Sequence, residues 1–373
     1  MISGKWPSGF QYNLDNNRMS PDYTCNETRL LFIINCDINM KNPLAIATVS
    51  LGQHPSHTLS SKIAAAAQHG FSALEIVYND LKTHAASSVP RVTIQVAAEE
   101  ISALCASHNL AVLSLNPFKN CEGHSSALSE RLESARHWIE IARILKAQYL
   151  QVPSQFDAEN SMGDENFIIA ELQQLADLAA ANAPGLKIAY EAVAWGSYVN
   201  TWQDSLRIVE VVNKDNFCVC LDAFHVIARL WGDITTESGK RETGENVNDL
   251  LQQSLHEFIT DFPLDKISYM QLSDGEKYSP PLSPEHRFYD ASFPSALTWS
   301  RNTRPFPLEK EYGAYLPVTR VARAWLVEKG WKGYVSFETF DWRMREESNG
   351  PECNAKRAAE SWRRLLAELD MAL

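Results

Sequence analysis

The sequence predicts an α/β protein whose strands and helices form a (β/α)8 barrel. Eight short apolar segments alternate with helical patterns from about residue 44 to the C-terminus, which is typical of a parallel α/β architecture. Eight such repeats in roughly 330 residues fit a closed barrel. A doubly wound open sheet is the alternative, but no glycine-rich phosphate-binding motif follows the first strand.

The expected strands are short apolar runs, and the expected helices carry apolar residues at helical spacing. In chain order, strands are predicted at 44–52, 72–78, 110–118, 147–153, 186–192, 216–225, 267–274 and 333–341. Helices are predicted at 60–70, 94–108, 126–145, 165–182, 202–212, 247–261, 317–329 and 355–369. Two long connections, at about 226–246 and 275–316, are expected to carry function, because long loops on a compact barrel usually do.

The first 43 residues differ in character from the rest of the chain. They are rich in Asn, Asp and Pro and show no sustained periodicity. We therefore expect residues 1–43 to form a partly irregular N-terminal extension. Residues 44–373 are expected to form a single catalytic barrel domain.

The composition excludes several classes of protein. The formal net charge of −12 gives no general attraction to nucleic acid or to anionic membranes. No apolar run approaches the length needed to span a bilayer. The seven cysteines include no CxxC motif, which favours reduced thiols and a cytoplasmic location. A homo-oligomer is an open alternative to a monomer.

Polar side chains recur at the carboxyl ends of four consecutive predicted strands, where a barrel builds its active site. They are Glu191 in "LKIAYEAVAWG", Asp222 in "CLDAFH", Gln271 in "YMQLSD" and Glu338 in "VSFETF". Any one of these carboxylates alone could equally form a salt bridge or cap a helix. Together, three crowded carboxylates need a cation among them, and an oxygen-only set suits Mg²⁺ or Mn²⁺, with Co²⁺ as a further candidate.

Other residues near these strand ends are candidates for proton transfer and substrate binding. His225 follows Asp222 by three residues and is a candidate general base, or else a residue that orients the substrate. The segment "LTWSRNTRPFP" supplies Ser300, Arg301 and Arg304, and Lys119 follows the third strand. Arginine pairs with carboxylates through two hydrogen bonds, so a small anionic substrate is expected. The alternative is that these cations are solvated surface charges.

Two further groups of residues can be interpreted either as structural or as part of the site. Glu75 lies in the middle of the second strand and is interpreted as structural or as supporting the site. Trp195, Trp299 and Trp342 follow strand ends, where they could wall a pocket or simply pack.

With these motifs in hand, the chain resembles the dehydratase branch of the xylose-isomerase-like barrel superfamily. The motifs "YEAVAWGSYVNTW", "CLDAFHV", "YMQLSD", "WSRNTRPFP" and "GYVSFETF" occur in the order seen in 3-dehydroshikimate dehydratases of the fungal type, and the similarity covers about residues 44–370. The resemblance implies dehydration of 3-dehydroshikimate to protocatechuate and water by enolate formation and β-elimination. It also implies that Glu191, Asp222, Gln271 and Glu338 bind a divalent metal, that His225 takes a proton, and that Arg304 meets the substrate carboxylate with Ser300 and Lys119 nearby.

Three other functions compete with this interpretation. A metal-dependent sugar or keto-acid isomerase or epimerase would use the same barrel, but it more typically shows histidine ligands and a second base. A DNA-repair nuclease is disfavoured by the acidic balance and the lack of a basic stripe. A non-catalytic metabolite-binding barrel is disfavoured by the full set of metal-ligand types.

Overall fold

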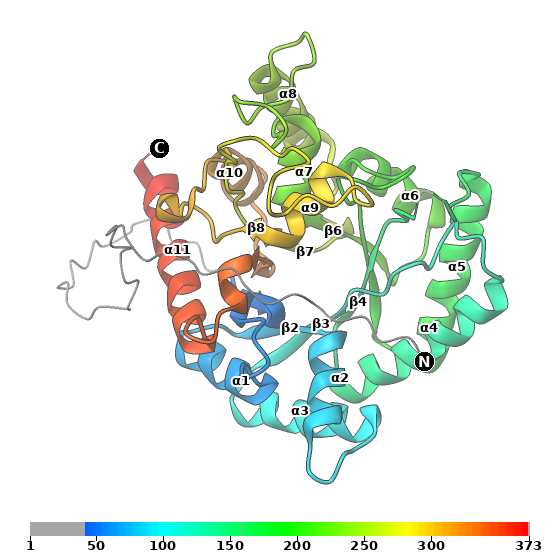
Figure 1. The fold of residues 1–373 in the computed structure, drawn as a ribbon. Helices are drawn as coiled ribbons and strands as arrows, with labels where there is room; N and C mark the ends of the chain where they lie inside the picture. The colour runs from blue at the N-terminus through cyan, green and yellow to red at the C-terminus, as the bar shows by residue number, and fades with distance from the viewer. Residues whose placement is uncertain (1–41, 158, 372–373) are drawn as a thin grey trace, which may run out of the picture. The chain divides into compact units, whose positions relative to one another are not determined.

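A computed structural model describes residues 42–157 and 159–371. Eight parallel strands close into a barrel, and helices surround them (Figure 1). Leu44 lies opposite Val335, so the first and last barrel strands pair and complete the closure. The (β/α)8 prediction is therefore confirmed. The barrel strands are β1 (Leu44–Ala47), β2 (Ala73–Val77), β3 (Ala111–Asn116), β4 (Tyr149–Pro153), β5 (Lys187–Glu191), β6 (Phe217–Asp222), β7 (Ile267–Leu272) and β9 (Val335–Phe337).

The strands are apolar almost throughout because they are buried on both faces. Their outward side chains pack against the helices in one large cluster of buried residues. The inward side chains form a smaller cluster that fills the barrel below the site: Ala45, Ala73, Leu113, Ala189, Cys220 and Tyr269. The floor of the barrel is thus a packed core rather than a channel.

Polar residues fix where several of the surrounding helices begin. A side-chain oxygen at the residue before each of five helices accepts a backbone N–H of the first turn, which satisfies a donor that the helix itself leaves unpaired. These capping residues are Thr58, Thr93, Asp164, Thr201 and Asn246. The helices are α1 (Leu59–Gln68), α2 (Tyr78–Ser87), α3 (Ile94–Ser107), α4 (Leu128–Leu145), α5 (Glu165–Asn182), α6 (Trp202–Val212), α7 (Ala223–Leu230), α8 (Val247–Asp261), α9 (Ser295–Asn302), α10 (Val318–Ala322), followed directly by a π-helical turn (Arg323–Glu328), and α11 (Pro351–Met371).

The structure corrects several expected boundaries. The first predicted strand ends early, because residues Thr48–Leu51 form a 3₁₀ turn. The sixth ends at Asp222, and α7 begins at the next residue with Asp222 as its N-cap. Helices α2, α7 and α9 were not predicted, and α9 lies within the long connection 275–316.

That connection also forms a small sheet at the mouth of the barrel. Strand β8 (Thr303–Arg304) pairs antiparallel with β10 (Phe340–Asp341), with Arg304 opposite Phe340. The chain after β7 is therefore brought back beside the chain after β9. This pairing was not predicted, and it places Arg304 in the site.

Residues 1–41 of the predicted N-terminal extension lie outside the described residues. Asn42 is buried, and its amide donates hydrogen bonds to the backbone oxygens of Trp331 and Gly333, at 3.0 and 2.9 Å. Within the described ranges, no helix combines the length and the apolar character needed to cross a membrane.

Candidate active site

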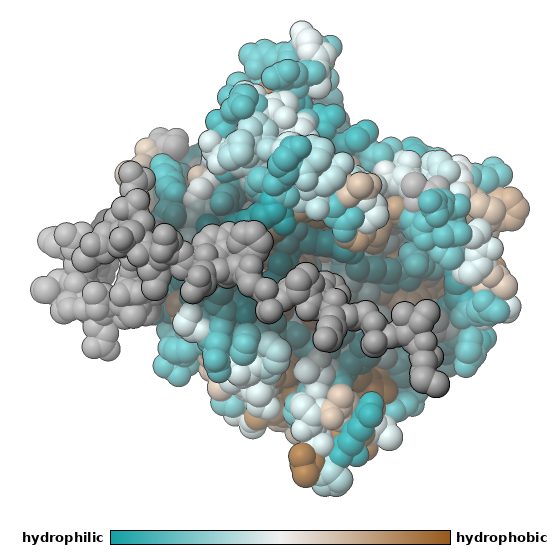
Figure 2. All heavy atoms as spheres, in the orientation of Figure 1, coloured by the Kyte–Doolittle hydropathy of each residue, from teal (hydrophilic) through white to brown (hydrophobic). Residues whose placement is uncertain are grey.

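A cavity of about 270 Å³ opens at the carboxyl ends of the barrel strands. This volume lies just below the range of roughly 300–1,000 Å³ typical of small-molecule sites, so it suits a small metabolite. The space-filling view shows a hollowed centre on this face with largely hydrophilic surroundings (Figure 2). Its polar and charged lining residues are Asn79, Asn116, Lys119, Gln151, Glu191, His225, Ser300, Arg301, Arg304 and Glu338.

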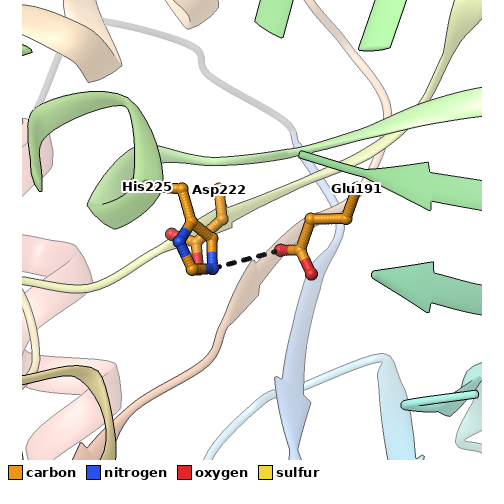
Figure 3. A group of neighbouring side chains, drawn as sticks. All are labelled: Glu191, Asp222 and His225. Carbon is orange, nitrogen blue, oxygen red and sulfur yellow. Dashed lines mark ion pairs between the residues drawn. The ribbon is translucent and has the colours of Figure 1, made fainter. Parts of the chain in front are cut away.

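Glu191, Asp222 and His225 come together at one side of this cavity (Figure 3). Glu191 ends β5 and Asp222 ends β6. Asp222 Oδ1 accepts the backbone N–H of Phe224 at 2.7 Å, so it caps α7, and His225 lies in the first turn of that helix. His225 Nε2 lies 3.8 Å from Glu191 Oε1 and 3.7 Å from Asp222 Oδ2. These are three ligand types that could hold a metal ion.

Gln271 lies directly opposite Asp222 in the strand register. Its amide nitrogen donates to both oxygens of the fully buried Glu75, at 3.0 Å each. Because the nitrogen end is fixed in this way, the amide oxygen must point away from Glu75, where the thiol of Cys220 contacts it at 3.6 Å. The Gln271 oxygen is of the type that a hard metal ion binds, but here it faces the Cys220 thiol, so the role of Gln271 as a ligand stays a prediction.

Glu75 organises more than Gln271. Its carboxylate also accepts hydrogen bonds from Ser114 at 2.9 Å, Asn116 at 3.0 Å and Ser336 at 2.5 Å. The carboxylate thus joins side chains from β3, β7 and β9 inside the barrel. The interpretation of Glu75 as a supporting residue agrees with these contacts, since such partners orient metal ligands.

Glu338 and Asp222 share a single arginine. The Arg304 guanidinium lies 2.5 Å from Asp222 Oδ2 and 3.5 Å from Glu338 Oε2. It also donates to Ser273 Oγ at 2.9 Å and to Ser300 Oγ at 3.4 Å. Arg304 is only 1 % exposed, and it lines the cavity. Its contacts among the described residues use four hydrogen bonds of a group that has five N–H donors, so its contact with the substrate carboxylate stays a prediction.

The carboxylates of this region strongly oppose one another's ionisation. Burial raises the pKa of Glu191 well above its ordinary value, and Glu338 and Asp222 raise it further. Burial also raises the pKa of Glu338, although Arg304 partly offsets the effect. The region holds the carboxylates of Glu75, Glu191, Asp222 and Glu338, and Arg304 pairs with Asp222 and Glu338, so the site can accept further positive charge.

A divalent cation would offset this excess of negative charge. Glu191 Oε1 is buried and has no hydrogen-bond partner among the described residues, an arrangement that is costly unless something else satisfies the atom. Asp222 lies in the same group as Glu191, while Glu338 and Gln271, at the ends of neighbouring strands, remain predicted oxygen donors. The donor types match Mg²⁺ and Mn²⁺ better than softer ions.

The predicted cations Lys119 and Arg301 lie at the rim of the cavity, and both side chains are exposed. Partial desolvation lowers the pKa of the Lys119 amine, and the Arg301 charge lowers it further. The Arg301 guanidinium stacks 4.3 Å from the centre of the Phe293 ring. Two adjacent cations at a cavity mouth favour an anionic ligand.

The loop after β5 fixes the position of the His225 ring. The backbone N–H of Ala194 donates to His225 Nδ1 at 3.1 Å. Trp195 packs edge-on against the imidazole, with 4.8 Å between ring centres. Gly196 permits this tight path, because a Cβ there would overlap the carbonyl oxygen of Val199. The "AWG" of the sequence motif thus shapes the pocket.

The Ala194 bond sets the protonation pattern of His225. Burial lowers the pKa of the imidazole to about 4, and Arg304 also lowers it although Asp222 opposes the shift. His225 is therefore neutral near pH 7. Since Nδ1 accepts a hydrogen bond, the single proton of the neutral ring lies on Nε2, the nitrogen that faces Glu191 and Asp222.

Sequence reasoning did not identify three polar lining residues, Asn79, Asn116 and Gln151, whereas Trp195, which it offered as a possible pocket wall, does line the cavity. Asn116 and Gln151 lie on β3 and β4. Within these predicted strands, the sequence alone did not distinguish a polar side chain that faces the cavity from one that packs in the core. A signal was present, since a polar residue inside a buried strand needs a partner. Trp299 and Trp342 are not among the residues that line the cavity.

Comparisons with known proteins agree with this architecture. Residues 63–365 match the family model described as xylose isomerase-like TIM barrel. A 3-dehydroshikimate dehydratase of Neurospora crassa is 36% identical over 88% of this chain and 95% of its own length.

Two solved structures extend the comparison. A xylose isomerase-like TIM barrel/4-hydroxyphenylpyruvate dioxygenase fusion protein has a TM-score of 0.66 and 27% identity, covering 87% of this chain and 42% of the other. The IOLI protein, solved with a zinc atom bound, has a TM-score of 0.63 and 19% identity, covering 87% of this chain and 98% of its own, and it supports the fold alone. The chain therefore belongs to the xylose isomerase-like TIM barrel family and, within it, to the 3-dehydroshikimate dehydratases.

Proposed function

We propose that this protein dehydrates 3-dehydroshikimate to protocatechuate and water. One observation carries the proposal: a single cavity is lined by the carboxylates of Glu191 and Glu338 and, at its exposed rim, by the cations of Lys119 and Arg301. The substrate has matching ends, because its ring carries a carboxylate on one side and a ketone beside a hydroxyl on the other. The 36% identity to the Neurospora crassa dehydratase over 88% of the chain supports the same reaction.

We propose Glu191, Asp222, Gln271 and Glu338 as the residues that hold a divalent ion. Mg²⁺ and Mn²⁺ suit these oxygen donors, with Co²⁺ as a further candidate. His225 lies close enough to contribute a ligand, but its Nε2 carries the ring proton in this arrangement and has no lone pair to offer. When bound, the ion would act as a Lewis acid toward the substrate ketone.

Lys119 and Arg301 are proposed to bind the substrate carboxylate, with the Ser300 hydroxyl contributing from the wall of the cavity. Arg304 also pairs with Asp222 and Glu338. It holds these two carboxylates in place from the side of the small β8–β10 sheet. Replacing such a buried partner would leave both charges uncompensated.

His225 is proposed to transfer a proton through Nε2. The carbon between the ketone and the carbon that bears the departing hydroxyl loses a proton, the hydroxyl leaves with a proton as water, and transfer of one further ring proton to the former ketone oxygen completes the aromatic ring. With Nδ1 bound by Ala194, Nε2 is placed to give its proton to the departing hydroxyl. The sequence prediction that His225 accepts the first proton requires the opposite tautomer and the loss of that bond.

The reaction is tested by mixing the Mg²⁺-supplemented protein with 3-dehydroshikimate and following the ultraviolet absorbance of protocatechuate. We expect product formation by the wild-type protein and none by Glu338→Gln, because that substitution removes a proposed ligand. The matched control is Glu133→Gln on α4, where an exposed carboxylate pairs only with Arg136. An active Glu338→Gln protein would remove this residue from the ligand set, and an inactive wild-type protein with Mg²⁺, Mn²⁺ and Co²⁺ would refute the proposed reaction.

A further inference from the structure

The cavity contains buried polar atoms that no residue of the described chain satisfies. They are Asn116 Oδ1, Gln151 Oε1 and Trp195 Nε1, besides the Glu191 oxygen assigned to the metal site. Asn116 is 1 % exposed and Gln151 is 2 % exposed. A buried polar atom without a partner costs about 1–3 kcal/mol, so three of them lining one cavity indicate a ligand that pairs with them.

The orientation of both amides is fixed by carboxylates. The Asn116 amide nitrogen donates to Glu75 Oε2 at 3.0 Å, and the Gln151 amide nitrogen donates to Glu191 Oε2. If either amide were turned over, its oxygen would face a carboxylate oxygen, and the two acceptors would repel each other. Both residues therefore present an acceptor oxygen as their unpaired atom.

These acceptors occupy a distinct part of the cavity. Asn116 ends β3 and Gln151 lies on β4, and these two strands pair with each other. The proposed metal ligands instead come from β5, β6 and β7 and from the residue that follows β9. A ring that spans the cavity would meet oxygen acceptors on the β3–β4 side.

We propose that Asn116 and Gln151 are substrate-binding residues that accept hydrogen bonds from hydroxyl groups of the ring, while the Trp195 indole N–H donates to a ring oxygen. The inference rests on the proposed function and deepens it. An amide oxygen pairs with a hydroxyl but repels a carbonyl or carboxylate oxygen, so the pair selects a hydroxylated ring acid. A site built to bind a hydroxyl discriminates strongly against the analogue that lacks it, because its own polar groups are then left unpaired.

The test compares two acids that the proposed reaction does not consume. Shikimate carries three ring hydroxyls, and 1-cyclohexene-1-carboxylate has the same ring and carboxylate without any. Their dissociation constants are measured by calorimetry for the full chain in Mg²⁺ buffer. We expect the wild-type protein to prefer shikimate at least about tenfold, which corresponds to roughly the strength of one hydrogen bond.

Two replacements of Asn116 separate the acceptor from the bond to Glu75. Both Asn116→Leu and Asn116→Asp remove the amide nitrogen, but only the aspartate keeps an oxygen toward the ring. We expect Leu to lower the preference for shikimate about tenfold and Asp to retain it, and Gln151→Met to act like Leu. In every variant, binding of the unhydroxylated acid reports that the pocket is intact.

An unchanged preference in both Asn116→Leu and Gln151→Met would overturn the proposal. So would an equal loss in Asn116→Leu and Asn116→Asp, because the effect would then come from Glu75. Binding equilibria are read here without turnover, so this result is independent of whether 3-dehydroshikimate is dehydrated.

Discussion

Glu75 fixes the orientation of the polar side chains around it. It is a fully buried carboxylate that accepts five hydrogen bonds, including two from Gln271 and one from Asn116. Because it takes up the nitrogen ends of both amides, it leaves the Asn116 oxygen free for the proposed hydroxyl site and the Gln271 oxygen against the Cys220 thiol. Glu75 thus decides which atom each amide presents.

Replacing His225 tests which proton-transfer step this residue serves. In His225→Gln we expect protocatechuate formation to fall roughly 10²-fold or more. The proton on the carbon beside the ketone should still exchange with D₂O above the enzyme-free rate, because Nε2 serves the departing hydroxyl in this arrangement. Proton NMR of 3-dehydroshikimate in D₂O measures both events in one sample. Parallel loss of exchange and product would instead identify His225 as the first proton acceptor.

At the scale of elements, strand order was the most informative feature of the sequence. Glu191, Asp222, Gln271 and Glu338 could be placed together because consecutive strands of a parallel barrel end at the same face. Asp222 and Gln271 are indeed register partners. The position of His225 on a helix was not predicted, because apolar residues continue on both sides of Asp222 without a Gly or Pro, although Asp222 is itself a helix N-cap type.

Glu122 links three elements near the site and should make stability depend on pH. Its carboxylate accepts the backbone N–H of Gln155 at 2.7 Å and the hydroxyl of Tyr190 at 3.1 Å. Burial raises its pKa from 4.5 to about 7. Between these two values the folded state holds more protons at Glu122 than the unfolded chain, so the free energy of unfolding falls as pH rises through this window.

The predicted contribution of Glu122 is on the order of 3 kcal/mol between pH 4.5 and 7. It can be isolated by urea unfolding of the wild-type protein and Glu122→Gln at several pH values. The difference between their unfolding free energies should change across this window and level off above it. Glu133→Gln is the exposed control and should follow the wild-type curve. Parallel curves for wild type and Glu122→Gln would show that Glu122 does not titrate there.

At the scale of the whole molecule, closure of the barrel and the path of one long connection determine the site together. The connection 275–316 returns over the mouth, forms the β8–β10 sheet and inserts Arg304 between Asp222 and Glu338. Its sequence identified Arg304 as a candidate, but the partner of Arg304 depends on where the loop runs in space. Two-residue strands and long loops carry too little periodic signal to reveal that path.

In the same arrangement, negative charge lies deep in the cavity and positive charge lies at its rim. Carboxylates gather at the floor, and Lys119 and Arg301 lie at the rim. We propose that this arrangement orients a ring acid with its carboxylate outward and its ketone toward the metal, and that dehydration depends on a divalent ion at the floor.

The most direct test is to strip the protein with a chelator, remove the chelator, and follow protocatechuate formation from 3-dehydroshikimate while Mg²⁺, Mn²⁺ or Co²⁺ is added back. We expect no turnover in the stripped protein and saturable recovery with at least one of these ions. We also expect Glu338→Gln not to recover at the concentrations that restore the wild type. Full turnover by the stripped protein, unchanged on adding any of the three ions, would show that dehydration does not depend on a divalent ion.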